Sequence, residues 1–346
     1  MSHELVNVQF SGDGAGVVIV DQTLLPNEAR SLELRSAYEM REAIASLRVR
    51  GAPALGIFAA FALCALARQS AAEGYGGFRA DVLKYSAFLA SARPTAVNPS
   101  KQLRRMEDLV GSLEGASIPL ILDAMRGEAE RIRQEDVEMC RAISENGLGL
   151  IRDGFGVMTH CNAGPLATSR YGTALGPILM AQERGVRIRA YCCETRPLLQ
   201  GARLTAYELD AAGVDCTLIC DNMASIVMKE RRVDAVFAGC DRLARNGDAA
   251  NKIGTSGLAI LAKHYGIPFY IFCPSSTFDP GCATGGEIEI ELREPGEIKE
   301  LFFAKPVAPA GVKCYNPSFD VTDNGLITAI VTEKGVFRAP FEQSLG

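Results

Sequence analysis

The hydrophobic positions of the chain follow two different patterns, one before and one after Leu150. In the first part they recur at helical spacing, which predicts helices over 37–46, 54–68, 78–91, 101–113 and 118–147. In the second part short apolar runs alternate with helical stretches, which predicts strands over 156–159, 187–192, 215–219, 235–238 and 269–272. Such a strand–helix–strand series forms a parallel sheet with helices on both faces. Two later runs, 288–292 and 327–332, are expected to add edge strands.

The change of pattern predicts an α/β protein of two domains. Residues 1–140 are expected to form a mixed, mostly helical N-terminal domain, with a small sheet that includes the apolar run 16–20. Residues 141–346 are expected to form a doubly wound parallel sheet. The long amphipathic stretch 118–147 would link the two, with the boundary between residues 136 and 150.

A dense polar stretch, residues 239–255, follows the buried strand expected near 233–238 and precedes a helix expected over 257–264. We expect this stretch to be a loop. It carries two aspartates, two arginines, two asparagines and a lysine. That mixture suits a pocket for a phosphorylated, hydroxylated small molecule. The alternative is a solvated loop whose Asp and Asn side chains cap its own turns.

Three other strands of the second half also end in polar stretches, at 159–164, 193–197 and 221–222. The carboxyl ends of parallel strands meet at one edge of a sheet, so these side chains are expected to converge with the stretch above. A nicotinamide site would need G-x-G-x-x-G after the first strand. Residues 161–166 contain a single glycine, so no dinucleotide cofactor is expected.

Two side chains at these strand ends suit acid–base or nucleophilic chemistry. Cys161 would lie at a strand end and before a helix, whose N-terminus lowers the pKa of a thiol. The alternative is an ordinary buried thiol. Asp241 follows an apolar strand, so partial burial would raise its pKa, as a general acid requires. The alternative is a carboxylate paired with Arg242 or Arg245.

Two basic side chains suit an anionic ligand. Arg50 precedes a Gly-Ala-Pro turn that starts a helix, where free backbone N–H groups bind anions. A plain helix start with one exposed arginine is the alternative. Lys252 is expected to contact a phosphate or a hydroxyl group, in preference to forming a Schiff base.

Composition excludes several classes of protein. The 346-residue chain has a net charge of −5 and no run of basic residues, so we expect no nucleic-acid partner. Its longest apolar stretch, 57–67, is too short to cross a bilayer, and its first residues lack a signal peptide's pattern. The eleven cysteines form no C-x-x-C pair and there are three histidines. We therefore expect most of the cysteines to be buried reduced thiols, and we expect no metal site and a cytoplasmic location.

Six stretches together resemble the methylthioribose-1-phosphate isomerase family, whose superfamily includes regulatory subunits of the translation-initiation exchange factor. They run over nearly the whole chain: Asp21–Pro26, Val49–Ala54, Arg93–Asn98, Thr159–Gly164, Glu194–Ala206 and Asp241–Thr255. The resemblance implies a Rossmann-like C-terminal domain, a homodimer and no cofactor. It also implies catalysis by Cys161 and Asp241 on a small phosphorylated sugar. The implied substrate contacts are Arg50, Gly51, Ala52, Arg93, Gln200, Asn251 and Lys252.

The activity implied by the resemblance is aldose–ketose isomerisation of 5-methylthioribose 1-phosphate in methionine salvage. Asp241 would protonate the ring oxygen as the ring opens, and Cys161 would assist the movement of hydrogen between C2 and C1. Arg50 and the amides of Gly51 and Ala52 would hold the phosphate. Whether hydrogen moves as a proton or a hydride stays open at this point.

The chain departs from the usual family pattern after Asn98, where Pro99-Ser100-Lys101 replaces a segment with Leu and a nearby Trp. This segment could line the pocket for the sugar's 5-substituent, so 5-deoxyribose 1-phosphate is an alternative substrate. Ribose 1,5-bisphosphate is a third, although the only basic residues nearby, Lys101, Arg104 and Arg105, fit a helix surface. A non-catalytic regulatory protein of the same fold is the alternative of another class.

Overall fold

The computed structural model describes residues 7–93 and 97–345. One of the six stretches that carry the resemblance is Arg93–Asn98, and its residues Pro94–Ala96 lie outside the described residues. Contacts between Cα atoms divide the chain into two compact units. The first comprises Met1–Glu138 with Pro165–Arg170, and the second comprises Met139–Gly164 with Tyr171–Gly346. Among the described residues, no helix combines the length and the apolar character needed to cross a membrane.

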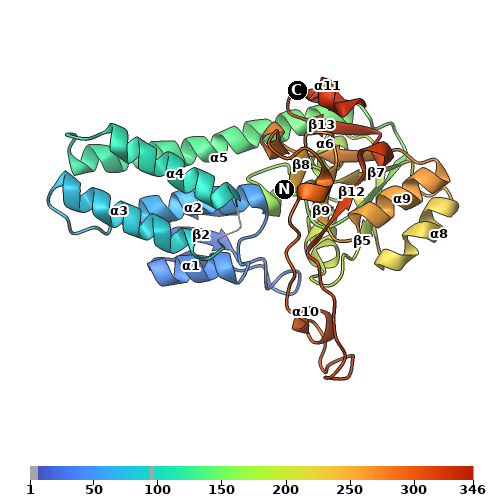
Figure 1. Cartoon of the computed structure of the whole chain (residues 1–346), viewed down its shortest axis with the longest axis horizontal. Helices are drawn as coiled ribbons and strands as arrows, with labels where there is room; N and C mark the ends of the chain where they lie inside the picture. The colour runs from blue at the N-terminus through green and yellow to red at the C-terminus, as the bar shows by residue number, and fades with distance from the viewer. Residues whose placement is uncertain (1–6, 94–96, 346) are drawn as a thin grey trace. The chain divides into compact units, whose positions relative to one another are not determined.

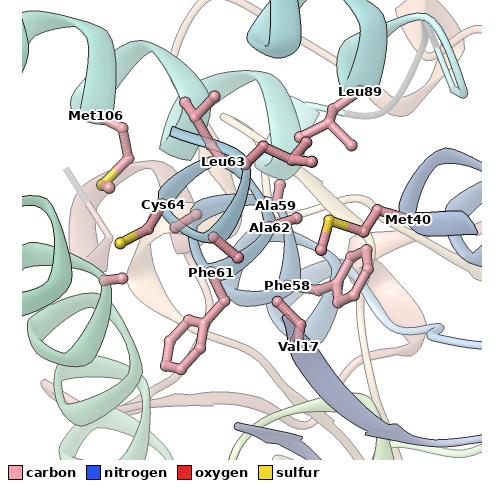
Figure 2. Close-up of a cluster of buried hydrophobic side chains, with 14 of the residues drawn as sticks. Val17, Met40, Phe58, Ala59, Phe61, Ala62, Leu63, Cys64, Leu89 and Met106 are labelled. Carbon is pink, nitrogen blue, oxygen red and sulfur yellow. The ribbon is translucent and has the colours of Figure 1, made fainter. Parts of the chain in front are cut away.

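The first unit is built around one buried helix, α2 (Ala52–Ala67). Its sequence is apolar on every side, and every residue from Ala54 to Ala67 is buried. A helix that is hydrophobic all round must be covered by its neighbours. The Phe58 and Phe61 side chains of α2 project into the core that Figure 2 shows, together with Met40 and Met106 from other helices.

Four further helices and a small sheet complete the first unit (Figure 1). The helices are α1 (Ala37–Ala45), α3 (Tyr75–Ala90), α4 (Val97–Ser112) and the first part of α5 (Ile118–Leu148). The antiparallel strands are β1 (Val8–Phe10), β2 (Val17–Val20) and β3 (Ser31–Leu34). The five helices expected in this part of the chain are thus confirmed, with ends that shift by up to four residues. Ser36 caps α1 through a capping box with Glu39, which explains its sharp start.

The second unit contains a seven-stranded sheet in the order β14-β13-β10-β7-β4-β5-β6. All neighbouring pairs are parallel except β13 with β14. Its strands are β4 (Phe155–Thr159), β5 (Ile188–Cys193), β6 (Asp215–Ile219), β7 (Ala235–Ala238), β10 (Phe269–Phe272), β13 (Ala329–Thr332) and β14 (Gly335–Phe337). The chain runs outward from β4 in one direction and from β7 in the other, so the switch point of the sheet lies between these two strands.

Helices cover both faces of this sheet. One face packs against α8 (Ala224–Lys229) and α9 (Thr255–Tyr265), and the other packs against α6 (Gly176–Glu183) and α7 (Ala206–Ala211). The apolar runs of the central strands are buried on both sides for this reason. The parallel, doubly wound sheet expected from the alternating pattern is therefore present.

A second sheet of four strands lies beside the first, in the order β11-β8-β9-β12. Its strands are β8 (Arg242–Ala244), β9 (Ala249–Lys252), β11 (Phe278–Asp279) and β12 (Phe319–Thr322). The expectation that 239–255 is a loop was therefore wrong, because β8 and β9 form a hairpin around Asn246 and Gly247. An Asn-Gly pair between short strands is a strong hairpin signal.

Two expectations about the end of the chain also need correction. Residues 288–292 form no strand, and only Leu292 makes an isolated bridge, to Pro317. The run near 327–332 does form a strand, β13, but it lies inside the sheet between β10 and β14. In the sequence between residue 292 and β13, α10 (Gly296–Lys299) lies at the tip of two extended segments that run away from the sheet (Figure 1). The chain ends with α11 (Phe341–Ser344).

Candidate active site at the switch point

Cys161 lies two residues beyond β4, at the switch point of the large sheet. Its side chain is buried and its backbone has a φ of 60°, in the left-handed region that non-glycine residues avoid. The expectation that it precedes a helix was wrong, because the next α-helix, α6, begins only at Gly176. A single 3₁₀ turn, η1 (Pro165–Ala167), follows the left-handed residue Cys161. The segment directly after Cys161 therefore starts no α-helix.

The segment after Cys161 is fixed by a buried polar network. The Asn162 amide donates to the hydroxyl of Thr205 at 3.2 Å and to the carboxylate of Glu208. Gly164 leaves room for that carboxylate, since a Cβ there would lie 2.3 Å from Glu208 Oε2. Buried polar groups satisfied in this way hold one conformation. The Asn-Ala-Gly sequence after Cys161 thus shapes the turn that carries the thiol.

His160 connects the end of β4 with the chain beyond β9. Its Nε2 lies 2.8 Å from the carbonyl oxygen of Ile253, to which it donates in the neutral tautomer. Burial lowers the pKa of His160 below its usual range, so the imidazole is uncharged near neutral pH. The residue therefore acts as a neutral donor within the core of the second unit.

Three groups of the types that bind metals lie together behind this turn: His160, Cys193 and Asp221, with ligand atoms within 4.8 Å of one another. Both carboxylate oxygens of Asp221 already accept backbone N–H bonds, from Thr195 and Arg196, each at 2.8 Å. Burial raises the pKa of the Cys193 thiol, which favours its protonated form. Through these hydrogen bonds, Asp221 holds the backbone of the segment that follows β5.

Asp241 follows β7, which is the parallel neighbour of β4 in the sheet. The two segments that carry Cys161 and Asp241 thus leave adjacent strands, as expected for a doubly wound order. Asp241 is exposed, however, where partial burial was expected. It stands at the base of the β8–β9 hairpin, with its backbone N–H bonded to the Ala250 carbonyl at 2.9 Å. Arg242 pairs with Asp279, with 3.0 Å between Nε and Oδ2.

The turn of the hairpin has a structural role. Asp248 is buried and accepts four hydrogen bonds, from the Gly285 N–H, from the Asn324 backbone and side chain, and from the Asn246 amide. Although burial opposes it, these donors lower the pKa of Asp248. The capping interpretation therefore holds for this aspartate and for Asn246.

Asn251 and Lys252 follow along β9. The Asn251 side chain is buried and donates to the Thr255 hydroxyl at 3.0 Å. The Lys252 ammonium donates to the Ser318 carbonyl at 2.9 Å and lies 4.3 Å from the centre of the Phe319 ring. A half-buried ammonium held by a carbonyl and a ring face is well placed to meet an anion.

Gln200 stands at the start of a π-helical turn, η2 (Gly201–Thr205), beyond β5. It is buried, and its Oε1 atom accepts no hydrogen bond from any residue in the described part of the chain. A buried acceptor left in this state is costly to the fold. The side chain is thus ready to accept a hydroxyl group of a ligand.

The other candidate residues belong to the first unit. Gly51 precedes α2 with a φ of 92°, and a Cβ there would lie 2.4 Å from the Ala167 carbonyl oxygen. The position thus requires glycine. Arg50 is half-buried beside it, and Ala52 begins the helix whose first N–H groups can bind an anion. Arg93 is half-buried just beyond α3.

Sequence reasoning missed the two threonines that hold the backbone of Cys161. Thr195 accepts the Cys161 N–H at 2.8 Å, and Thr205 donates to the Cys161 carbonyl at 2.6 Å. Both lie in the Glu194–Ala206 stretch quoted above, but nothing in a single sequence marks a hydroxyl as the partner of a distant backbone. Seven of the eleven cysteines are buried, as expected for most of them, but Cys216 and Cys220, which lie in apolar runs, are only half-buried. All eleven are free thiols.

Comparison with known proteins gives a consistent result. The model of the "Initiation factor 2 subunit family" matches residues 48–339. A protein from Symbiobacterium thermophilum named methylthioribose-1-phosphate isomerase is 57% identical over 345 residues, covering 100% of this chain and 96% of that protein. A 5-deoxyribose 1-phosphate isomerase from Petrotoga mobilis is 54% identical, covering 95% of this chain and 94% of that protein.

Among solved structures, 5-methylthioribose 1-phosphate isomerase from Pyrococcus horikoshii superposes with a TM-score of 0.93 at 38% identity. The match covers 97% of this chain and 93% of that one. Sequence and fold therefore agree, and the resemblance found in the sequence is confirmed. The chain belongs to the Initiation factor 2 subunit family and, within it, to the methylthioribose-1-phosphate isomerase family.

Proposed function

We propose that this protein is an aldose–ketose isomerase that converts 5-methylthioribose 1-phosphate to 5-methylthioribulose 1-phosphate, a step of methionine salvage. The observation that carries the proposal is the pairing of β4 with β7, because the segments with Cys161 and Asp241 leave these neighbouring strands. Ligands of doubly wound sheets bind at this switch point. Relatives that match the chain along nearly its whole length carry the name of this activity.

The proposed chemistry follows from the substrate. Phosphate on C1 blocks spontaneous opening to an aldehyde, so an acid must protonate the ring oxygen as the ring opens, the role we assign to Asp241. The exposure of Asp241 in the single chain leaves it accessible to a ligand. Hydrogen then moves from C2 to C1 with the assistance of Cys161. The C2 hydroxyl gives up its proton to the Asp241 carboxylate, so C2 becomes the carbonyl of the ketose and the acid is regenerated. A carboxylic acid and a thiol are sufficient for both steps, so no cofactor is proposed.

Substrate contacts are proposed for Arg50, Gly51, Ala52, Arg93, Gln200, Asn251 and Lys252. The N–H groups at the start of α2, with the Arg50 guanidinium, would hold the phosphate. The Oε1 of Gln200, which has no hydrogen-bond partner among the described residues, would accept a sugar hydroxyl. Asn251 and Lys252 would contact the remaining oxygens of the sugar or its phosphate.

A second substrate, 5-deoxyribose 1-phosphate, is favoured by the 54% identity to a protein of that name, nearly equal to the 57% of the first. The two sugars differ only at C5, which carries a methylthio group in the first and a hydrogen atom in the second. Pro99 and Ser100 near the start of α4 depart from the usual family pattern and are the proposed place to look for that distinction.

The decisive experiment compares kcat/KM for 5-methylthioribose 1-phosphate, 5-deoxyribose 1-phosphate and ribose 1,5-bisphosphate, with the ketose product followed by NMR. We expect the first to be preferred and the bisphosphate to be poorest, since the basic residues after Asn98, which are Lys101, Arg104 and Arg105, fit a helix surface. Turnover of none of the three would contradict the enzyme and favour the regulatory alternative. Preference for the bisphosphate would overturn the charge argument.

We also propose that the protein is a cytoplasmic homodimer with domains at 1–140 and 141–346. The segments around α10 expose several apolar side chains, which is typical of surfaces that a partner covers. They are Leu292, Phe302, Phe303, Val307 and Tyr315. Light scattering on the purified protein should give twice the 37.1 kDa of one chain. A mass of one chain at micromolar concentration would reject the dimer.

A further inference from the structure

Two left-handed residues meet behind the switch point. Cys161 has a φ of 60° and Thr195, which lies just beyond β5, has a φ of 64°. This conformation is unfavourable for most residues and especially so for a β-branched one such as threonine. Strained backbone of this kind persists only where surrounding contacts impose it, and it concentrates at functional sites.

The two residues are joined by a hydrogen bond. The Cys161 backbone N–H donates to Thr195 Oγ1 at 2.8 Å. The Cys161 carbonyl accepts from Thr205 Oγ1 at 2.6 Å. Both threonines are fully buried. The main chain of Cys161 is therefore held on its two sides by side-chain hydroxyls, which replace the backbone partners that a strand or a helix would supply.

Thr195 is itself held in place. Its hydroxyl donates to the Cys193 carbonyl at 3.0 Å, so an oxygen lone pair is free to face the Cys161 N–H. Its own N–H donates to Asp221 Oδ1 at 2.8 Å. The chain of contacts runs from Asp221 through Thr195 to Cys161, and each member is fixed before any ligand arrives.

We propose that Thr195 and Thr205 are positioning residues that set the direction of the Cys161 thiol for the reaction. The inference rests on the catalytic role proposed above for Cys161. Without the two hydroxyls, the Cys161 backbone would relax toward the extended region that cysteine prefers, and the Cα–Cβ bond would turn with it. A displacement of about 1 Å in a reacting group costs on the order of 100-fold in rate.

The choice of threonine at position 195 supports this role. Glycine or asparagine would adopt the left-handed conformation at lower cost. What threonine supplies and glycine lacks is the hydroxyl that accepts the Cys161 N–H. The strain is thus explained by the hydrogen bond that the strained residue makes.

The test uses variants that remove each hydroxyl, Thr195→Gly and Thr205→Val, together with Thr195→Ser and Thr205→Ser, which keep it. Thr195→Gly also relieves the strained φ, so the loss of the hydroxyl is not confounded with added strain. Thr322→Val is the matched control, because Thr322 is buried and its Oγ1 has no partner among the described residues. Each variant is assayed for kcat and KM, and its amide exchange over 157–164 is followed by mass spectrometry.

We expect the glycine and valine variants to lose about 10- to 100-fold in kcat with KM changed by less than about threefold. The serine variants should recover most of kcat, and Thr322→Val should leave both constants unchanged. The Cys161 amide should exchange faster in Thr195→Gly than in the wild type. Should Thr195→Gly fold poorly, the comparison of Thr205→Val with Thr205→Ser carries the kinetic test.

Two results would overturn the proposal. Unchanged exchange in Thr195→Gly would mean that the hydroxyl does not hold the Cys161 backbone. Faster exchange with wild-type kcat would mean that the hydrogen bond is structural only. If instead Cys161→Ser retained full turnover, the catalytic role of Cys161 would fall, whereas the exchange result would still report on the contact between Thr195 and Cys161.

Discussion

The imidazole Nε2 of His160 lies 2.8 Å from the carbonyl oxygen of Ile253, so the residue before Cys161 is bonded to the residue after Lys252. The two residues are 93 positions apart in the sequence and follow different strands, β4 and β9. Through this bond, the turn that carries the Cys161 thiol and the segment that carries the Lys252 ammonium are held together within the second unit.

This contact predicts a pH dependence of stability. Burial lowers the pKa of His160 in the folded state below its ordinary value of 6.5, so below pH 6.5 the unfolded chain binds the proton more readily than the folded one. The contribution of the neutral, buried His160 to the free energy of unfolding is therefore complete above pH 6.5, and it is lost progressively as the pH falls below 6.5. His160→Gln, which keeps a donor for Ile253 but cannot titrate, should show a shallower fall of Tm between pH 7 and 5. Identical slopes for the two proteins would contradict the assignment.

The proposed catalytic pair can be tested by near-isosteric changes. Cys161→Ser and Asp241→Asn each remove a protonation equilibrium while keeping the size of the side chain, so kcat should fall by at least about 1,000-fold with the fold intact. Cys240→Ala is the matched control. Burial and the neighbouring Cys273 thiol raise the pKa of Cys240, which makes it a poor nucleophile. An inactive Cys240→Ala with an active Cys161→Ser would reassign the chemistry to the thiol beside Asp241.

Gln200 should serve binding more than folding. Because its buried Oε1 has no donor among the described residues, Gln200→Leu removes an unsatisfied acceptor and should leave Tm unchanged or higher. If that oxygen accepts a sugar hydroxyl, KM should rise about tenfold, the loss of one hydrogen bond of about 1.4 kcal/mol. Thermal unfolding and steady-state kinetics on the same preparation measure both. A lower Tm with unchanged KM would show that the amide is structural.

Gly51 should tolerate no side chain. Its φ is 92°, and a Cβ at this position would lie 2.4 Å from the Ala167 carbonyl oxygen, so Gly51→Ala adds backbone strain and a clash with main chain. We expect a loss of more than about 2 kcal/mol in the free energy of unfolding. Gly127→Ala, in the interior of α5 with nothing within 4 Å of the new Cβ, should instead gain about 1 kcal/mol. Urea denaturation of both variants decides, and equal effects would refute the argument.

Much of the architecture was predictable from local pattern. The all-apolar sequence of α2 requires burial whatever surrounds it. The strands β4, β5, β7 and β10 appear as short apolar runs because both faces of the sheet are covered there. The placement of polar stretches after β4 and β7 followed from chain direction alone. The burial of α2, the apolar strands and the polar strand ends each depend on residues that are close together in the sequence, so the sequence alone is enough to predict them.

Other features of the site depend on residues far apart in the chain. Asp248 looked like a ligand group, yet Gly285 and Asn324 satisfy its oxygens from 37 and 76 positions away. The exposure of Asp241 depends on the formation of the β8–β9 hairpin, at whose base it stands, and the half-burial of Cys216 depends on its place in an edge strand. The periodicity of the sequence indicates which side of a helix or strand a residue lies on, but it does not indicate which distant residue contacts that side chain.

What the sequence by itself determined is the helices of the first unit, most strands of the large sheet, and the sheet edge at which the polar stretches lie. The tertiary structure alone decided how the Cys161 thiol is presented, because its left-handed backbone is imposed by hydroxyls 34 and 44 residues away. Local preference would have placed that residue in an extended conformation. The long-range hydrogen bonds of Thr195 and Thr205 outweigh this preference only once β4 and β5 lie side by side.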